Sequence, residues 1–180
     1  MDKAALRIRY RQERKLLTSV KDDSLLWNHI CDLPEFNSSR TVASYYSYGD
    51  EPSTEKLNQQ ILKAGKKIAL PIVQQDRNLT WALWDGNAKS LQKQGNLFVP
   101  KTNPIDPNEI DFVIVPCLHV NRSGYRLGQG GGSYDRALVG MKAFRIGLIY
   151  STEITNEPLP IEAHDQKLDA VATPELIVRF

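Results

Sequence analysis

The stretch DFVIVPCLHVNRSGYRLGQGGGSYDRAL, residues 111–138, joins a short apolar run to a long loop that contains five glycines. The run FVIVP shows no alternation of polar and apolar residues, which is typical of a strand buried on both faces of a sheet. After the glycines, residues 134–139 predict a short helix. A buried strand that leads through a loop into a helix favours an α/β fold with a mainly parallel sheet.

The rest of the chain alternates between the same two kinds of element. Hydrophobic spacing predicts helices over residues 2–17, 22–33 and 52–65; the second is capped by Asp22, Asp23 or Ser24 and ended by Pro34. Runs of β-branched and aromatic residues predict strands over 41–48, 67–73, 79–84, 144–150 and 168–172. Residues 85–109 are polar and contain several prolines, so we expect loops there with a short strand at 97–99. We predict one domain over residues 1–180, with the sheet flanked by helices in a Rossmann-like three-layer arrangement.

The charge balance limits the kinds of partner. The chain has 23 basic and 21 acidic residues and a net charge of +2, which offers no broad field for nucleic acid or a membrane surface. Cys31 and Cys117 lie far apart and form no CxxC pair, which argues against a disulfide framework and a zinc site. The N-terminus is charged from its second residue, unlike a signal peptide. We expect a cytoplasmic monomer that binds neither nucleic acid nor membranes.

The glycine loop has the chemistry of a phosphate-binding site. Glycines allow positive φ angles and a close approach to a ligand, and consecutive N–H groups can then form an anion-binding nest. The N-terminus of the next helix adds its dipole, and Arg122, Arg126 and Arg136 add positive charge. Asp135, directly after the loop, is a candidate Mg²⁺ ligand beside bound phosphates. The alternative for Asp135 is a carboxylate that only stabilises the helix N-terminus.

Two common phosphate-binding motifs do not match. The chain has no GxxxxGK followed by Ser or Thr, and the dinucleotide pattern GxGxxG, begun at Gly128, fails at Ser133. The glycines also begin well after the preceding strand, whereas the dinucleotide loop joins strand to helix tightly. A flexible surface loop with incidental arginines remains the alternative.

Beyond these chemical features, the sequence resembles the 5-formyltetrahydrofolate cyclo-ligase family. RLGQGGGSYDR, residues 126–136, is similar to the family's glycine loop, roughly RLGxGxGYYDR, although Ser133 stands where the family usually has a tyrosine. Further similar segments follow the family's order: KAALR (3–7), YYSYGDEPST (45–54), KIALPIV (67–73) and HDQKLDAVATPE (164–175). The resemblance therefore spans nearly the whole chain.

The resemblance implies an enzyme that uses ATP and Mg²⁺ to convert 5-formyltetrahydrofolate to 5,10-methenyltetrahydrofolate, with release of ADP and phosphate. It implies catalytic roles for Arg126 and Asp135, a Mg²⁺ shared by Asp135 and Asp165, and a folate contact at Glu51. It also implies an ATP-binding set, made of Lys3, Arg7, Arg126, Leu127, Gly128, Gln129, Gly130, Gly131, Gly132, Ser133 and Tyr134. Such an enzyme neutralises and positions phosphoryl groups, which is the chemistry expected of the glycine loop.

Several assignments have alternatives at this stage. Arg11 and Arg14, on the same predicted helix as the proposed phosphate ligands, are expected to be solvated. Asp169 competes with Asp165 as the second metal ligand. The tyrosines at 45, 46 and 48 either line the pocket or pack in the core. For the whole chain, the alternatives are an NAD(P)-binding oxidoreductase and a non-catalytic nucleotide- or phosphosugar-binding module.

Overall fold

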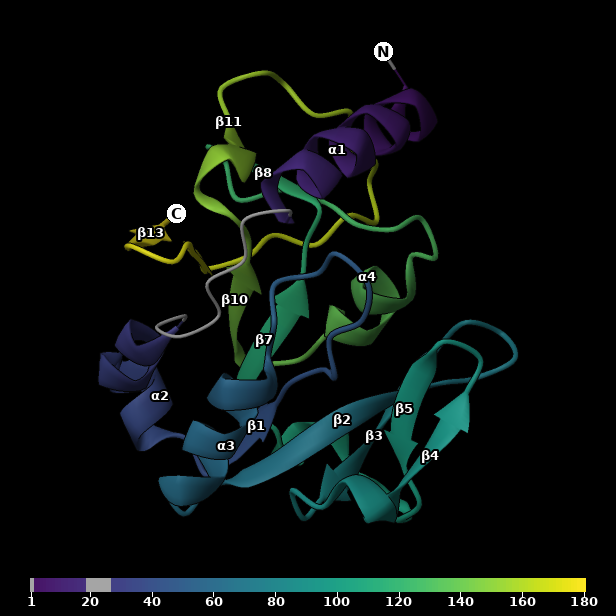
Figure 1. Ribbon diagram of the computed structural model, residues 1–180, viewed down its shortest axis with the longest axis vertical. Coiled ribbons are helices and arrows are strands. Elements are labelled where there is room, and N and C mark those ends of the chain that lie inside the picture. Colours follow the sequence, from purple (N-terminus) through teal and green to yellow (C-terminus); the bar gives the residue numbers. More distant parts are fainter. Residues whose placement is uncertain (1, 19–26) are drawn as a thin grey trace.

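Within the residues that the computed structural model describes, 2–18 and 27–180, the main feature is an eight-stranded sheet (Figure 1). Its strand order is β13-β12-β10-β7-β1-β2-β3-β6. The strands from β12 to β2 run parallel, and antiparallel strands lie at both edges. The predicted α/β fold is therefore confirmed. The bounds of these strands are β1 Thr41–Ala43, β2 Lys67–Val73, β3 Leu79–Trp84, β6 Pro104–Ile105, β7 Phe112–Pro116, β10 Phe144–Leu148, β12 Ala170–Ala172 and β13 Ile177–Arg179.

Strand β7 is buried on both faces, as its continuous apolar run predicts. Phe112 and Ile114 pack in the same cluster as the apolar residues of α2 and α3, whereas Val113 and Val115 pack in a second cluster with Leu138 of α4. Because successive side chains of a strand point to opposite faces, one short run supplies both layers of the core. The α-helices in the described residues are α1 Lys3–Thr18, α2 Pro34–Ser38, α3 Glu55–Lys63 and α4 Ser133–Leu138.

Helix α1 lies across the carboxyl ends of the parallel strands, at the top of Figure 1. Leu6 and Tyr10 of α1 form a small apolar cluster with Leu118, Leu127 and Leu159, which come from the loops beyond the sheet. Beneath α1, a small three-stranded sheet orders these loops, with strands β8 His119–Asn121, β9 Arg126–Leu127 and β11 Ile154–Thr155. The N-terminal helix and the glycine loop therefore meet at the edge of the sheet where α/β proteins bind ligands.

The predicted second helix is wrong in the part that can be compared. Its capping residues 22–24 lie outside the described residues, and the segment after them holds only a 3-10 helix at Asn28–Asp32. Pro34 begins α2 instead of ending a helix. A proline is well tolerated at the first position of a helix, because the N–H that it lacks would have no partner there.

The predicted strand over residues 41–48 is also shorter than expected, because β1 ends at Ala43. The carbonyl oxygen of Tyr45 accepts hydrogen bonds from Thr54 Oγ1 at 2.6 Å and Asn58 Nδ2 at 3.0 Å. These side-chain donors take the place of a neighbouring strand, so the chain leaves the sheet at residue 45. The tyrosines that follow are thereby carried toward the ligand-binding edge.

Several further strands were not predicted at their full extent. The segment 85–109 contains the hairpin β4 Leu91–Gln94 and β5 Leu97–Pro100 as well as β6, and β13 follows the last predicted strand. The hairpin turns at Gly95-Asn96, where Gly95 has φ of 61°, a sequence and geometry typical of tight hairpins. In the described residues, no helix is both long enough and apolar enough to cross a membrane.

Candidate active site

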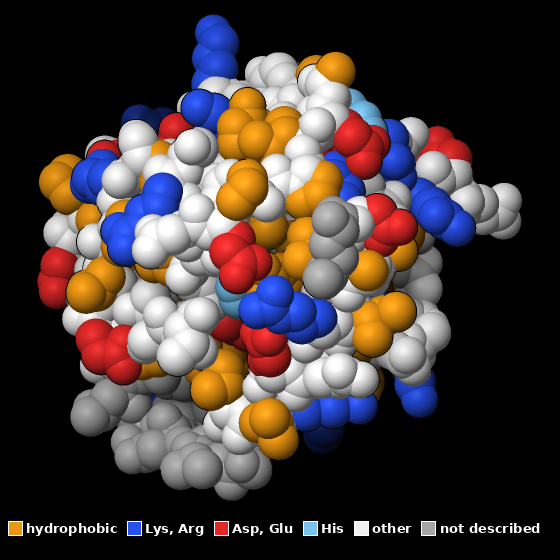
Figure 2. All heavy atoms as spheres, turned by 90° about the horizontal axis from the view of Figure 1, so that it is seen from above, with side chains coloured by type: hydrophobic (Ala, Val, Ile, Leu, Met, Phe, Trp, Pro, Cys, Tyr) orange, Lys and Arg blue, Asp and Glu red, His pale blue; other side chains and the backbone are white. Residues whose placement is uncertain are grey.

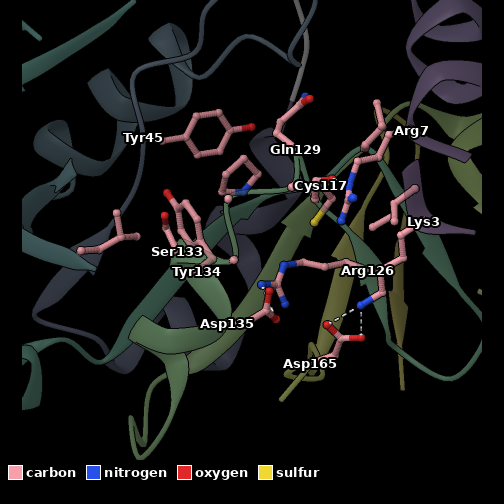
Figure 3. Close-up of a pocket in the computed structure, with 18 of the residues that line it drawn as sticks. Lys3, Arg7, Tyr45, Cys117, Arg126, Gln129, Ser133, Tyr134, Asp135 and Asp165 are labelled. Carbon is pink, nitrogen blue, oxygen red and sulfur yellow. Dashed lines mark hydrogen bonds and ion pairs between the residues drawn. The ribbon is translucent and has the colours of Figure 1, made fainter. Parts of the chain in front are cut away.

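A cavity of about 800 Å³ opens at the carboxyl edge of the sheet. Its lining comes mainly from α1, from the segment after β1, from the glycine loop and from the loop before β12, with further residues from β2, β3 and β5. In Figure 3, Lys3, Arg7 and Arg126 approach from one side, while Tyr45, Ser133 and Tyr134 lie on the other. The residues that the family resemblance places at the site all line this cavity; these are Lys3, Arg7, Glu51, Arg126, Leu127, Gly128, Gln129, Gly130, Gly131, Gly132, Ser133, Tyr134, Asp135 and Asp165. Arg122 and Arg136, expected to add positive charge, do not line it, because they bind Asn156 and Asn78 instead.

The glycine loop is held against α1 by two arginines. Arg7 Nε donates to the carbonyl oxygen of Gly128 at 2.9 Å, and Arg11 donates to the side chain and the backbone oxygen of Gln129 at 2.9 and 3.0 Å. Gly130 and Gly132 have φ angles of 106° and 64°, which side chains with a Cβ rarely adopt. Gly132 also precedes the first residue of α4. These contacts place the glycine loop beside the N-terminal helix.

Asp135 is tied to Arg126 at the end of this loop. Arg126 Nη2 lies 2.8 Å from Asp135 Oδ1, and Nη1 of the same guanidinium donates to the carbonyl oxygen of Gln166 at 2.8 Å. The backbone N–H of Gln166 donates to Asp135 Oδ1 at 3.0 Å. The arginine side chain is only 3% exposed. The catalytic candidates named from the sequence are therefore neighbours, and a third segment of the chain orients both.

Lys3 and Asp165 form the second ion pair of the cavity, across 162 residues of sequence. Lys3 Nζ lies 2.6 Å from Asp165 Oδ2 and 3.0 Å from Glu162 Oε1. Burial alone would raise the pKa of Asp165, but the Lys3 ammonium holds it below its ordinary value. Asp169 instead accepts from the backbone N–H of Arg145 at 2.7 Å and does not line the cavity. Of the two aspartates considered as the second metal ligand, only Asp165 lines the cavity.

Glu51 follows β1 and marks the other end of the cavity. Its carboxylate accepts from the backbone N–H of Tyr48 at 3.2 Å, and burial raises its pKa to about 7. The tyrosines at 45, 46 and 48 all line the cavity. Tyr46 also packs against Phe98 and Trp84, with ring centroids 5.5 and 5.9 Å apart. This end of the cavity combines an aromatic wall with the carboxyl group of Glu51, whose pKa lies at about 7.

The raised pKa of Glu51 gives a pH-dependent contribution to stability. A carboxyl group that titrates near 4.5 when unfolded and near 7 when folded binds more protons in the folded state between these values. Its stabilising contribution is present below about pH 4.5 and is lost as the pH rises through about 7. We expect the wild type to lose thermal stability relative to Glu51→Gln between pH 5 and pH 8. Thermal scans across this range measure the difference, with Glu55→Gln on the exposed start of α3 as the control; parallel curves for Glu51→Gln and wild type would contradict the assignment.

The surface around the cavity carries no broad positive face. In Figure 2, blue, red and orange side chains are interspersed over the described part of the face seen from above. This distribution agrees with the small net charge of the chain. Inside the cavity, the cationic side chains are those of Lys3, Arg7 and Arg126, and two of them pair with carboxylates.

The expectation that Arg14 is solvated is wrong. Its side chain is 3% exposed, and its guanidinium binds Glu153 through Nε at 2.6 Å and Nη2 at 2.7 Å. Nη2 also donates to the carbonyl oxygen of Cys117, at the end of β7, at 2.7 Å. The helical spacing could have predicted this burial, because Arg14 lies four residues after the buried Tyr10 and so shares its face of the helix. Arg11, by contrast, is exposed at the edge of the glycine loop.

Fold and cavity together define a class: a single-domain α/β protein with a cavity at the carboxyl edge of a mainly parallel sheet, lined by a glycine loop, three cationic side chains and several tyrosines. The sequence profile of the 5-formyltetrahydrofolate cyclo-ligase family matches residues 1–174. The chain belongs to this family. Membership disfavours both the NAD(P)-binding oxidoreductase and the non-catalytic binding module.

Individual relatives agree with the family profile. The chain is 28% identical to the 5-formyltetrahydrofolate cyclo-ligase of Escherichia coli, over 93% of this chain and 97% of that protein. It is 33% identical to the enzyme of the same name from Mycolicibacterium smegmatis, over 77% and 75% of the two chains. The solution structure of Aquifex aeolicus 5,10-methenyltetrahydrofolate synthetase superposes with a TM-score of 0.82 at 27% identity, over 99% of this chain and 93% of that one. A Mycoplasma pneumoniae synthetase structure shares the fold, with a TM-score of 0.74 at 24% identity, over 95% and 98%.

Proposed function

We propose that this chain converts 5-formyltetrahydrofolate to 5,10-methenyltetrahydrofolate at the expense of ATP, which is the activity for which its family is named. The observation that carries the proposal is a cavity in which a glycine loop and three cationic side chains meet an aromatic, acidic slot. The first end suits the phosphates of ATP, and the second suits a flat ring with N–H donors. One chain supplies both ends, so we also propose that the cytoplasmic monomer is the active form and that the described domain needs no nucleic acid or membrane partner.

The reaction explains why both ends are needed. The formyl oxygen is a poor leaving group, and transfer of the γ-phosphoryl group from ATP to this oxygen turns it into a good one. The nitrogen at position 10 of the folate then attacks the activated formyl carbon, the ring closes and phosphate leaves. The protein's tasks are to hold the two substrates in line and to stabilise the charge on the transferring phosphoryl group.

The basic end is proposed to bind the triphosphate. Lys3 and Arg7 lie one helical turn apart on the face of α1 that lines the cavity, and Arg126 is buried beside the loop. Backbone N–H groups between Leu127 and Tyr134 are proposed to add an anion-binding nest. Buried guanidinium groups bind phosphate oxygens in a bidentate manner and cannot lose their charge. Arg126 is therefore the residue proposed to neutralise the transferring phosphoryl group.

The donor set of the cavity fits Mg²⁺. Asp135 and Asp165 both line it, and carboxylate oxygens together with phosphate oxygens and water are the ligands that Mg²⁺ prefers. The described residues contain no cluster of three or more His, Cys, Asp or Glu side chains able to hold a metal, so phosphate oxygens and water are proposed to complete the shell. When bound, Mg²⁺ would neutralise charge on the phosphates. Arg126 and Lys3, which pair with these carboxylates in the structure, would then turn toward phosphate oxygens.

Asp135→Asn is expected to raise the Mg²⁺ concentration needed for half-maximal activity by about tenfold, which corresponds to about 1.4 kcal/mol. The amide keeps the shape of the side chain but removes the negative charge that attracts the cation. The measurement is initial rate against Mg²⁺ at fixed total ATP. Asp169→Asn, outside the cavity, is the matched control and should leave the Mg²⁺ curve unchanged. If Asp135→Asn kept full activity at limiting Mg²⁺, Asp135 would not be a ligand.

One assay tests the function as a whole. Purified protein is mixed with 5-formyltetrahydrofolate, ATP and Mg²⁺, and formation of methenyltetrahydrofolate is followed by its near-ultraviolet absorbance. We expect product only when all three are present, with ADP and phosphate formed in equal amounts. Thermal shifts with ATP-Mg²⁺, NAD(P) and a phosphosugar separate the proposal from the disfavoured alternatives. Absence of ATP-dependent product from folded protein would contradict it.

A further inference from the structure

Two arginines that lie outside the cavity bind carbonyl oxygens of the glycine loop. Arg11 of α1 donates from Nη2 to the carbonyl oxygen of Gln129 at 3.0 Å. Arg136 of α4 donates from Nη2 to the carbonyl oxygen of Gly131, also at 3.0 Å. Neither arginine lines the cavity, although Gln129 and Gly131 do. The loop is therefore held from its outer side at two alternate peptide groups.

The contact made by Arg136 is anchored in a third part of the chain. Its Nη2 also donates to the carbonyl oxygen of Arg77 at 2.8 Å, and its Nε donates to Asn78 Oδ1 at 3.1 Å. Both acceptors lie in the turn between β2 and β3. A Cβ atom added at Gly132 would lie 3.0 Å from Arg136 Nη1, so the guanidinium rests directly against the loop. Arg136 thus joins the glycine loop to a turn of the main sheet.

These contacts fix the direction in which two peptide groups point. In a trans peptide, the carbonyl group and the N–H group that follows it point in opposite directions. Because the carbonyl oxygens of Gln129 and Gly131 are bound on the outer side, the N–H groups of Gly130 and Gly132 point the other way. Within the described part of the chain, neither N–H group has a hydrogen-bond partner. Both glycines line the cavity and have positive φ angles of 106° and 64°.

A loop rich in glycine needs such contacts if it is to keep one orientation. Glycine adopts both signs of φ at little cost, so a peptide group between glycines can turn over easily. A peptide group that turned over would present its carbonyl oxygen to a bound phosphate, and this oxygen repels an anion where the N–H attracts it. A guanidinium group keeps its charge and donates in a fixed geometry, which disfavours the reversed orientation.

We infer that Arg11 and Arg136 are positioning residues for the triphosphate of ATP, because they hold the N–H groups of Gly130 and Gly132 toward it. This inference rests on the proposed function and assigns the two arginines a role that needs no contact with the ligand. It replaces the expectation that Arg136 acts through its positive charge.

The test uses Arg11→Met and Arg136→Met, which remove the donors and keep an unbranched side chain. We expect each to raise the Kd for a non-hydrolysable ATP analogue with Mg²⁺, and the Michaelis constant for ATP, about three- to tenfold. The constant for the folate and kcat should stay within about twofold of wild type. Titration calorimetry and initial rates measure these values. Arg9→Met is the matched control, because Arg9 is an exposed cation of α1 that pairs with Glu13, and it should leave all of them unchanged.

Arg136→Lys separates the hydrogen bonds from the charge. Lysine keeps the positive charge, but its ammonium group lacks the rigid fork that reaches three acceptors in two segments. We expect Arg136→Lys to bind the analogue as weakly as Arg136→Met. If lysine restored the wild-type Kd, the arginine would act through its field, and the inference would be wrong.

The other outcomes separate this inference from the proposed function. If the wild type forms product and both methionine variants bind the analogue with unchanged Kd, the inference is wrong and the function stands. The same holds if the variants only melt at a lower temperature, or if only kcat falls, because the arginines would then act on stability or on the transferring phosphoryl group. If the wild type binds the analogue but forms no product, the function is wrong and the titrations still decide the inference. If the wild type does not bind the analogue, both are wrong.

Discussion

Arg14→Met is expected to lower the free energy of unfolding by about 3–5 kcal/mol, because it leaves the Glu153 carboxylate buried without its partner. Arg14 and Glu153 are 3% and 4% exposed, and their charged groups are joined by contacts of 2.6 and 2.7 Å. The substitution also removes the donor that satisfies the carbonyl oxygen of Cys117. A methionine fills most of the space of the arginine stem, so the loss reports mainly on charge and hydrogen bonding. Urea unfolding at pH 8 measures it.

Two controls separate the lone buried charge from lost packing. Arg14→Met combined with Glu153→Leu should be less destabilised than Arg14→Met alone, because no unpaired charge remains. Arg9→Met removes an exposed cation that pairs with Glu13 one helical turn away, and it should change stability little. The loss in Arg14→Met should also shrink as the pH falls, because burial raises the pKa of Glu153 and protonation removes its charge. Equal losses in the free energy of unfolding for Arg14→Met and Arg9→Met would show that the buried ion pair contributes no more to stability than the exposed one.

Arg126→Ala is expected to raise the Michaelis constant for ATP about ten- to a hundredfold, since it removes charge-assisted hydrogen bonds worth roughly 1.5–3 kcal/mol. The constant for the folate should change little, because the two ligands meet only where the γ-phosphate approaches the formyl oxygen. Arg122→Ala is the matched control. Arg122 lies in the same stretch, but it binds Asn156 outside the cavity. Thermal shift excludes misfolding, and an unchanged constant for ATP in Arg126→Ala would contradict the phosphate assignment.

The converse variant completes this test. Glu51→Gln keeps the shape of the side chain but loses the anionic acceptor, so it should raise the constant for 5-formyltetrahydrofolate and leave that for ATP nearly unchanged. Together the two variants distinguish two subsites from one general disturbance of the cavity. If Glu51→Gln mainly raised the constant for ATP, the folate contact would have to move to the tyrosines at 45 to 48.

Local patterns in the sequence were enough to predict the strand, loop and helix that form the proposed phosphate site. The run FVIVP predicted the doubly buried β7, because a continuous apolar segment must be covered on both sides. The glycines predicted a backbone with positive φ, and Gly130 and Gly132 adopt it. The helix spacing predicted α1 almost to its ends. Each inference depended on neighbours within a few residues, where propensity and periodicity act.

Only the tertiary structure decided how distant segments meet. Pairing across 162 residues joins Lys3 to Asp165, and pairing across 139 residues buries Arg14 against Glu153. Tyr45 leaves the sheet because donors at the start of a later helix and just before it take its carbonyl oxygen. Whether a charged side chain is solvated or buried, and whether a hydroxyl finds a partner, depends on atoms that the chain brings together only when it folds. The sequence by itself determined the kind of loop and the class of fold. Packing decided which side chains surround the cavity, because burial and pairing are properties of the folded molecule and not of a local pattern.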